Sequence, residues 1–294
     1  MSPPDGTPFA AILLAVLASA CFGTGLITTR FGMRGADARG GAAISVPTAA
    51  AFFACVSVFA LDVSAFDARA AAVFAAVGLF FPAAVTLINF VSTERLGPAL
   101  TGSIGGTSPA FGIVAALVVL GEPIPARALP AVAGIVAGVA LMSWARTGPS
   151  RAHAAWLLAL PVAGAAIRGL AQVFAKLGLA WWPSPLAATL IGYLASATVL
   201  TIAARARRSR PAARPDARTI AFFVATGLLN GLALLLSYLA LRRAPVALVS
   251  PIVASYPIFT LALAALLIRD ERVGARSVAG ALLTIAAVAW LVSG

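Results

Sequence analysis

The stretch that decides the fold reads Ala-Pro-Val-Ala-Leu-Val-Ser-Pro-Ile-Val-Ala-Ser-Tyr-Pro-Ile-Phe, residues 244–259, and it opens an uncharged run that ends at Ile268. About 20 apolar residues are enough to cross the hydrocarbon of a bilayer, so this run predicts a membrane-spanning helix. Pro251 and Pro257 lie inside it. A proline frees a backbone carbonyl and bends a helix, which a membrane tolerates only where protein or cavity water satisfies that carbonyl.

A second copy of this stretch occurs in the first half of the chain. Residues 96–111 read Leu-Gly-Pro-Ala-Leu-Thr-Gly-Ser-Ile-Gly-Gly-Thr-Ser-Pro-Ala-Phe. At a constant offset of half the chain, Pro109 falls on Pro257, and Glu122 matches Glu271 with a slip of one residue. The two copies indicate a duplication, and the paired prolines predict bends that shape or gate a cavity.

Composition places the chain in a membrane. Its residues are 61% apolar and 10% charged, with a mean hydropathy of +1.01, whereas soluble domains carry about 25% charged residues. The net charge of +12 does not indicate nucleic-acid binding, because the arginines lie between apolar runs and no soluble segment is long enough to form a basic face. Cys21, Cys55 and the loop residue His153 have no metal-ligand spacing, so we expect no metal or cofactor.

Charged residues divide the chain into ten apolar runs, each long enough to cross a bilayer. One of them is broken only by Arg168, and another begins near Leu186, after the turn-forming sequence Trp-Trp-Pro-Ser-Pro at residues 181–185. The runs are 6–29, 40–61, 70–93, 96–121, 128–145, 154–175, 186–204, 219–241, 244–268 and 277–294. The sequence therefore predicts an all-α integral membrane protein with ten transmembrane helices.

The first helix of each half also repeats. Aligning residues 9–32 with 154–178 pairs Gly23 with Gly169 and Gly32 with Gly178. We therefore predict two five-helix repeats, residues 1–148 and 149–294. Because each repeat crosses the membrane an odd number of times, the second is inverted relative to the first, an arrangement typical of transporters with a substrate site near the midplane.

These features resemble the drug/metabolite transporter superfamily, EamA type. The residues that carry the resemblance are Tyr238-x-Ala-Leu-x-x-Ala-Pro-Val-Ala247 followed by Pro257 and Glu271, and the first-half copy that ends in Gly121-Glu122-Pro123. Within the superfamily, the layout is most similar to YddG-type bacterial amino-acid exporters. The resemblance implies alternating access, a central cavity lined by the first four helices of each repeat, peripheral fifth helices, and a multi-pass protein of a bacterial-type inner membrane.

The distribution of basic residues favours the opposite orientation from the one that this resemblance implies. The family pattern keeps both termini in the cytoplasm. Fifteen of the 21 Lys and Arg residues lie in loops after odd-numbered helices, five lie in the other loops, and Arg168 is the remaining one. By the positive-inside rule, both termini should lie outside.

Arg168 is the only charged residue that the sequence places at mid-depth in a span. Burying an arginine there costs roughly 2.5–3.5 kcal/mol on insertion scales, so something must offset that cost. One interpretation is snorkelling or hydrogen bonds to free carbonyls, and another is a cavity arginine that binds a substrate carboxylate. A third is a shorter helix that places Arg168 near the membrane interface. Gln172 and Lys176 follow on the same helix face.

The third helix of each repeat places polar residues on one face. Aligning Gly78 with Gly227 pairs Phe81 with Asn230 and Asn89 with Tyr238. These residues either form hydrogen bonds between helices or line a cavity. We predict that they line a cavity, because several polar groups converge on it. The other candidates for this cavity, several of them beside the kinking prolines, are Thr24, Thr86, Thr107, Ser237, Ser255 and Tyr256, with Phe22 and Phe81 as apolar walls.

The sequence favours a secondary transporter that exports amino acids or similar zwitterionic or anionic metabolites. All nine acidic residues lie in loops or at span ends, which argues against a small cationic-drug antiporter. A nucleotide-sugar or other metabolite or drug carrier of the same superfamily is the alternative, and a multi-span enzyme is disfavoured because it needs a cluster of acids or histidines. We expect a small-molecule substrate and a monomer, with a dimer through Gly134-x-x-x-Gly138 as the alternative to simple helix packing.

Overall fold

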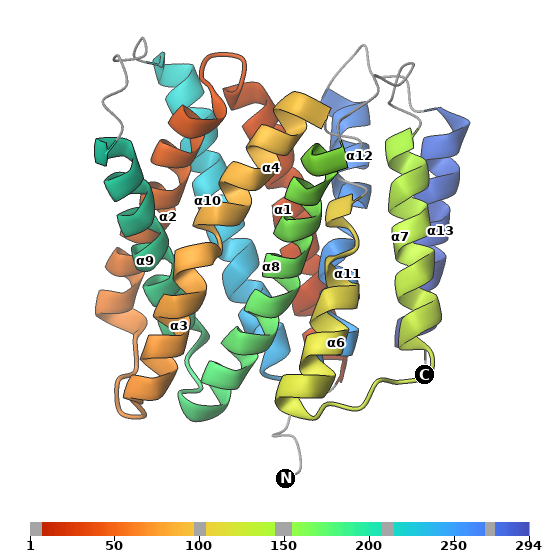
Figure 1. Cartoon of the computed structure of the whole chain (residues 1–294), viewed down its shortest axis with the longest axis horizontal. Helices are drawn as coiled ribbons and strands as arrows, with labels where there is room; N and C mark the ends of the chain where they lie inside the picture. Colours follow the sequence, from red (N-terminus) through yellow and green to blue (C-terminus); the bar gives the residue numbers. More distant parts are fainter. Residues whose placement is uncertain (1–7, 97–103, 145–154, 207–214, 268–273, 294) are drawn as a thin grey trace.

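The computed structural model describes residues 8–96, 104–144, 155–206, 215–267 and 274–293, and all regular secondary structure there is helical (Figure 1). Eight segments are long and apolar enough to cross a membrane, and two shorter apolar helices complete the ten predicted spans. The predicted boundary between the repeats, at residues 148 and 149, lies outside the described residues. The helices are α1 (Pro8–Gly32), α2 (Ala38–Ala60), α3 (Ala68–Phe80), α4 (Ala83–Leu96), α6 (Ser108–Leu120), α7 (Ala128–Trp144), α8 (Ala155–Trp181), α9 (Pro185–Ala206), α10 (Ala217–Leu241), α11 (Val246–Ala254), α12 (Pro257–Leu267) and α13 (Ala275–Val292).

Prolines interrupt the spans that approach the centre of the bundle. Pro257 begins α12 and separates it from α11, and Pro109 occupies the first turn of α6. A proline costs little in the first turn of a helix, where its missing N–H would have no intrahelical partner. The predicted bends are thus helix starts. The third span is broken between α3 and α4, at Phe81 and Pro82, which the sequence did not predict. Because of this break, Phe81 and Asn89 do not share one continuous helix.

The predicted duplication is visible in how the glycines pack. A Cβ atom at Gly32 would lie 2.9 Å from Cζ of Phe223, and one at Gly178 would lie 2.5 Å from Cε1 of Phe74. Each glycine therefore accepts a phenylalanine ring from the third span of the other repeat. The two five-helix repeats, inverted relative to each other, make the same contact twice.

A second matched contact joins the first helix of each repeat to the broken span of the other repeat. A Cβ atom at Gly23 would lie 2.8 Å from the carbonyl oxygen of Tyr256, and one at Gly169 would lie 2.7 Å from the carbonyl oxygen of Ser108. Only glycine permits backbones to approach this closely in lipid. The contact brings α1 against α12 and α8 against α6 beside the prolines.

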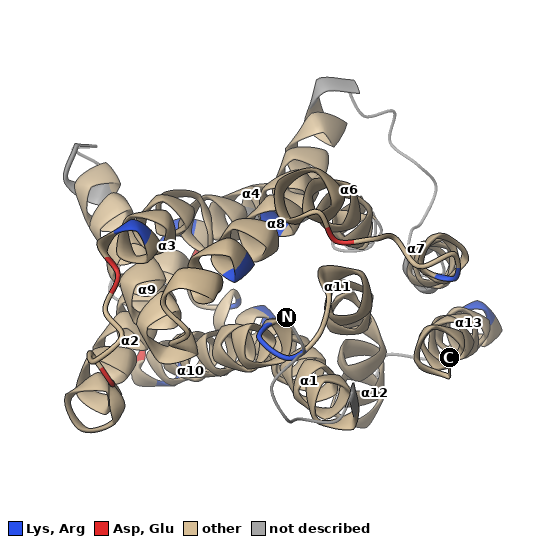
Figure 2. Ribbon diagram, turned by 90° about the horizontal axis from the view of Figure 1, so that it is seen from below, with Lys and Arg blue, Asp and Glu red and all other residues tan. Residues whose placement is uncertain are grey.

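The fifth helices, α7 and α13, pack against each other at one edge of the bundle (Figure 2). A Cβ atom at Gly134 would lie 2.8 Å from the Cβ atom of Ala287, and Gly138 lies against the hydroxyl of Thr284. The Gly134-x-x-x-Gly138 motif therefore serves helix packing within the chain. Its peripheral position agrees with the arrangement that the family resemblance implies.

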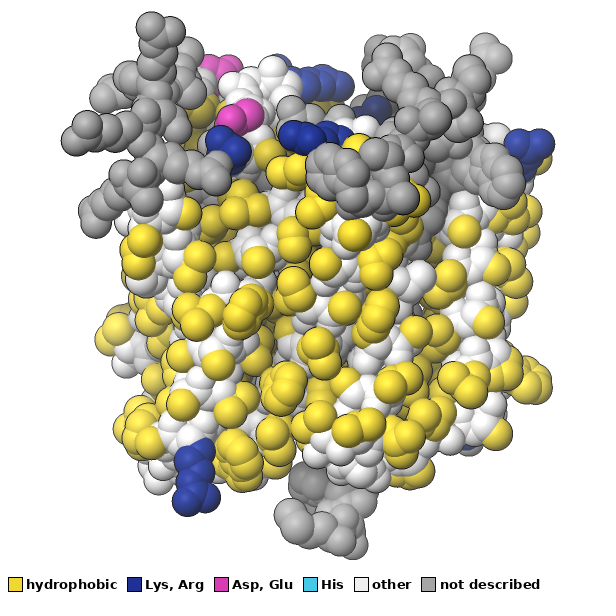
Figure 3. All heavy atoms as spheres, in the orientation of Figure 1, with side chains coloured by type: hydrophobic (Ala, Val, Ile, Leu, Met, Phe, Trp, Pro, Cys, Tyr) yellow, Lys and Arg dark blue, Asp and Glu magenta, His cyan; other side chains and the backbone are white. Residues whose placement is uncertain are grey.

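The outer surface between the two ends of the bundle is apolar (Figure 3). Large side chains such as Phe59, Val118 and Leu266 are 91%, 78% and 78% exposed, which a bilayer tolerates and water does not. The chain is a multi-pass membrane protein. We call the end at which α1 begins and α13 ends the terminal end (Figure 1).

Several acidic residues at the span ends cap helices. The carboxylates of Asp37, Asp67 and Asp216 accept backbone hydrogen bonds of 2.8–2.9 Å in the first turns of α2, α3 and α10. Caps of this kind satisfy amides that have no intrahelical partner. At Asp216, the hydrogen bonds from Thr219 hold the pKa of the carboxyl below its usual value.

Candidate functional site

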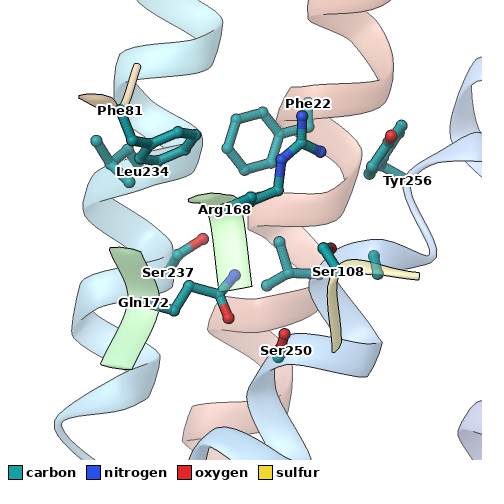
Figure 4. Close-up of a pocket in the computed structure, with 11 residues that line it drawn as sticks. Phe22, Phe81, Ser108, Arg168, Gln172, Leu234, Ser237, Ser250 and Tyr256 are labelled. Carbon is teal, nitrogen blue, oxygen red and sulfur yellow. The ribbon is translucent and has the colours of Figure 1, made fainter. Parts of the chain in front are cut away.

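A cavity lies at the centre of the bundle, where α1, α6, α8, α10 and α11 meet (Figure 4). The broken spans contribute four residues that directly precede a proline: Phe81, Ser108, Ser250 and Tyr256. The lining residues are Phe22, Phe81, Ser108, Arg168, Gln172, Leu234, Ser237, Ser250, Val253, Ala254 and Tyr256.

The lining reflects the internal repeat. The alignment that pairs Gly23 with Gly169 makes Phe22 the equivalent of Arg168. Both Phe22 and Arg168 line the cavity. Likewise, the paired prolines 109 and 257 place Ser108 opposite Tyr256. Equivalent backbone positions thus carry different chemistry in the two repeats: the second repeat contributes the cation, and the first contributes Phe22, Phe81 and Ser108.

Arg168 supplies the positive charge of this cavity. Its guanidinium carbon lies 5.8 Å from the ring centroid of Tyr256, and the Phe22 ring lies 6.5 Å from that same ring. The Nε atom is buried and has no hydrogen-bond partner. Within the described residues, no carboxylate forms an ion pair with Arg168. The aromatic ring offsets part of the desolvation cost and leaves Nε without a hydrogen-bond partner.

Neutral polar atoms complete the cavity. Gln172 is 7% exposed and its Oε1 atom has no partner; Ser250 is 1% exposed and its hydroxyl has none either. The Ser237 hydroxyl donates to the carbonyl of Ala233 at 2.8 Å. Buried polar atoms without partners are uncommon and costly, so three of them around one cavity indicate that water or a ligand occupies it.

The charged guanidinium and the neutral polar groups lie in different parts of the cavity. Figure 4 shows the guanidinium of Arg168 between Phe22 and Tyr256, whereas the amide of Gln172 and the hydroxyl of Ser250 lie on the other side of the Arg168 side chain. The cavity volume open to the centre of a water molecule is about 20 Å³. This is enough for about one water, so the cavity must widen to admit a larger molecule.

Four of the predicted site residues meet at this cavity: Arg168, Gln172, Phe81 and Tyr256. Phe22, which we predicted as an apolar wall, and Ser237 also line it. Five lining residues were not predicted from the sequence: Ser108, Ser250, Leu234, Val253 and Ala254. The repeat alignment contained a signal for Ser108, because it pairs this residue with Tyr256.

The other predicted residues are described but do not line this cavity. Thr24, Thr107 and Ser255 donate to carbonyls of their own helical segments, at 2.8, 2.6 and 2.6 Å, as hydroxyls in helices commonly do. Asn230 lies against Gly25 of α1, where a Cβ atom would come within 2.6 Å of Oδ1.

Asn89 and Tyr238 lie away from the cavity lining as well. Asn89 packs near Gly164 of α8, where a Cβ atom would lie 3.6 Å from Oδ1, and Tyr238 is buried in the main apolar cluster. The third-span residues that reach the cavity are instead Phe81 on one repeat and Leu234 and Ser237 on the other.

Both the sequence and the fold resemble those of known proteins. The sequence matches the EamA-like transporter family over residues 9–144 and again over 155–293. Among solved structures, one crystal structure of a protein superposes with a TM-score of 0.81 and 15% identity, over 95% of each chain. At that identity the likeness concerns the fold alone. No curated protein matches the sequence.

Proposed function

Because the chain belongs to the EamA-like transporter family, of the drug/metabolite transporter superfamily, we propose that it moves small carboxylate-bearing metabolites, amino acids first, through the central cavity by alternating access. The observation that carries the proposal is Arg168, a cation on the cavity lining that lies over the face of Tyr256 and whose buried Nε atom has no hydrogen-bond partner. A cation left unpaired in a low-dielectric interior is stabilised by an anionic ligand.

Guanidinium chemistry narrows the ligand to a carboxylate or a phosphate. Arginine presents parallel N–H donors that match two oxygens of one group, which gives both affinity and orientation. One cation suits a single carboxylate, whereas a nucleotide-linked metabolite would need further groups for its phosphates and base. An organic phosphate is therefore the alternative ligand, and transport assays should include one.

The neutral half of the cavity suits an ammonium group. Gln172 Oε1 and the hydroxyl of Ser250 are buried acceptors without partners. An amino acid with its carboxylate at Arg168 would direct its ammonium group to these acceptors. Of the polar residues that the sequence predicts for the cavity, Asn230 and Tyr238 do not line it, so Gln172 and Ser250 are the acceptors we assign. Since these acceptors are neutral, affinity should be modest.

The small size of the cavity supports alternating access. With room for about one water, the described conformation is closed around Arg168. Transport then requires the two repeats to move so that the cavity opens first to one side and then to the other. We place this cycle, in the export direction, in a bacterial-type inner membrane, in keeping with the family resemblance.

Proteoliposome transport of an amino acid and its amide tests the proposal. The amide lacks the carboxylate, so wild-type protein should transport the acid well and the amide poorly. Arg168→Gln should lose the acid, and Arg168→Lys should keep part of it because the charge remains without the bidentate geometry. Equal transport of acid and amide by the wild type, or acid transport by Arg168→Gln at the wild-type rate, would show that Arg168 is structural.

A further inference from the structure

A cluster of charged and backbone groups lies on the terminal side of the cavity. Glu122 and Lys176 form an ion pair, with side chains only 16% and 21% exposed. The second carboxylate oxygen of Glu122 accepts a hydrogen bond of 2.8 Å from the backbone amide of Val246. Lys176 in turn donates to the carbonyl of Ala244 at 2.7 Å. The two side chains thus connect the end of α6, the C-terminal half of α8 and the start of α11.

Local structure aims Glu122 at this cluster. Gly121 ends α6 in the left-handed conformation, with φ of 65°, and the amide of Glu122 donates back to the carbonyl of Ala116. A glycine at this position ends a helix and turns the following residue across its end. The Gly121-Glu122 pair, which the sequence showed as a simple span end, therefore directs a carboxylate from the first repeat towards the second.

The carboxylate fills a vacancy at the start of α11. Pro245, the residue that caps α11, makes no side-chain hydrogen bond to the helix amides. The N-terminus of a helix carries partial positive charge and amides without partners, so an anion there is stabilising. Glu122 supplies it from the other repeat, and opening this contact would leave both the helix end and Lys176 without their anion.

The cluster lies directly beneath the cavity. Lys176 follows Gln172 by one turn of α8, and Val246 precedes Ser250 by one turn of α11, which is a distance of about 6 Å along each helix. The ends of α6, α8 and α11 meet on this face of the molecule (Figure 2). A substrate passing between the cavity and the terminal end would have to part these ends.

We propose that Glu122, Lys176 and the first turn of α11 form an ionic latch, which holds the terminal end of the cavity shut and breaks each time the cavity opens there. The latch rests on the proposed function, since it regulates access to the same cavity. It joins the first repeat to the second across the route of opening. In water its charges would be solvated, so it is strong only while the end is closed.

The latch can be tested by cysteine accessibility, without any substrate. In a Cys21→Ala, Cys55→Ala background, Ala254→Cys places one thiol on the cavity lining. A membrane-impermeant thiol reagent is added to one side of oriented proteoliposomes at a time. From the terminal side, the intact latch should give slow labelling, and Glu122→Gln or Lys176→Gln should each raise the labelling rate at least about fivefold. Glu122→Gln keeps a carbonyl oxygen for the Val246 amide, which favours folding.

Two comparisons complete this experiment. The double variant should label no faster than the faster single variant, because the two residues act as a unit. Arg69→Gln removes an exposed charge at the same end, outside the cluster, and should leave the rate unchanged. Labelling from the terminal side that stays at the parent rate in both single variants would overturn the latch. So would the same increase in Arg69→Gln.

A covalent version keeps the proposal testable if either neutral variant fails to fold. Glu122→Cys with Lys176→Cys can be joined by a short bifunctional thiol reagent that a reducing agent cleaves. Joining should abolish terminal-side labelling of Ala254→Cys, measured on the peptide that contains residue 254, and reduction should restore it. Labelling of the same peptide from the opposite side is the control. Terminal-side labelling that persists after joining would overturn the latch. Neither result depends on acid transport through Arg168, so failure of the latch and failure of the proposed function are distinguishable.

Discussion

The guanidinium of Arg168 lies over the ring of Tyr256, with 5.8 Å between the guanidinium carbon and the ring centroid. This contact explains how the chain keeps a cation in an apolar interior without an acidic partner among the described residues. The ring face attracts the charge, worth about 0.5–2 kcal/mol, but forms no hydrogen bond with it. The ring therefore stabilises and orients the arginine while its Nε donor has no partner.

Replacing Tyr256 tests this arrangement. Tyr256→Phe keeps the ring and should transport the acid within about twofold of wild type. Tyr256→Ala loses the ring and should raise the KM for the acid by about 2- to 30-fold. The measurement is the concentration dependence of uptake in proteoliposomes. An unchanged KM in Tyr256→Ala would show that the ring does not hold the guanidinium in place.

The matched glycine contacts predict a stability effect. Gly23→Ala and Gly169→Ala would each put a Cβ atom within 2.8 Å of a backbone oxygen, which cannot rotate away. Each should destabilise the protein by about 1–3 kcal/mol and lower its Tm in detergent. Gly192→Ala is the control, because nothing lies within 4 Å of a Cβ atom there. A Tm for Gly169→Ala equal to that of the control would refute the tight contact.

The paired prolines predict an effect on rate. Pro257→Ala and Pro109→Ala restore a backbone donor and remove the ring that stops a helix from continuing through the break. We expect normal membrane insertion and slower transport, because a continuous helix would resist the bending that opens the cavity. The initial rate of uptake is the measurement. If both single variants transport at the wild-type rate, the prolines are features of packing alone.

Much of the fold could be predicted from the sequence because it depends on local composition and on duplication. The distribution of charged residues predicted the positions of the ten spans. The offset between the repeats predicted which residues are equivalent, and Gly32 and Gly178 indeed make matching contacts. The break at Pro82 had no partner in the second repeat, where Gly231 occupies the aligned position, so the repeat gave no signal for it. Such a break depends on what packs against it.

The site was predictable only where a residue type had few alternatives. A mid-span arginine must face a cavity or a partner, so Arg168 and its helix-face neighbour Gln172 followed from periodicity. A hydroxyl has a further choice, because it can bond to its own helix, as Thr24 does. Asn230 faces a glycine of α1, a packing detail that spacing along α10 does not contain.

The orientation of the chain is a further prediction. The described Arg30, Arg34, Arg39 and Arg95 are exposed at the end opposite the termini, where charged side chains gather (Figure 3). The positive-inside rule makes that end cytoplasmic. Alkaline phosphatase fused after Gly294 should then be active, and a fluorescent protein that folds only in the cytoplasm should stay dark. Bright fluorescence without phosphatase activity would favour the usual orientation of the family.

Gln172 separates recognition of the ammonium group from recognition of the carboxylate. Its Oε1 atom has no partner, and it lies one turn from Arg168 on the same face of α8. Gln172→Leu removes the acceptor and keeps a side chain of similar size. We expect the KM for an amino acid to rise about 3- to 30-fold, since an unmet hydrogen bond to a charged group costs about 1.5–3 kcal/mol and water can replace part of it. The matching acid that carries a hydrogen in place of the ammonium group should be transported as before, whereas Arg168→Gln should lose both compounds. If the KM of Gln172→Leu changes equally for the two compounds, Gln172 shapes the cavity without binding the ammonium group. Ser250 would then be the acceptor that remains for the ammonium group.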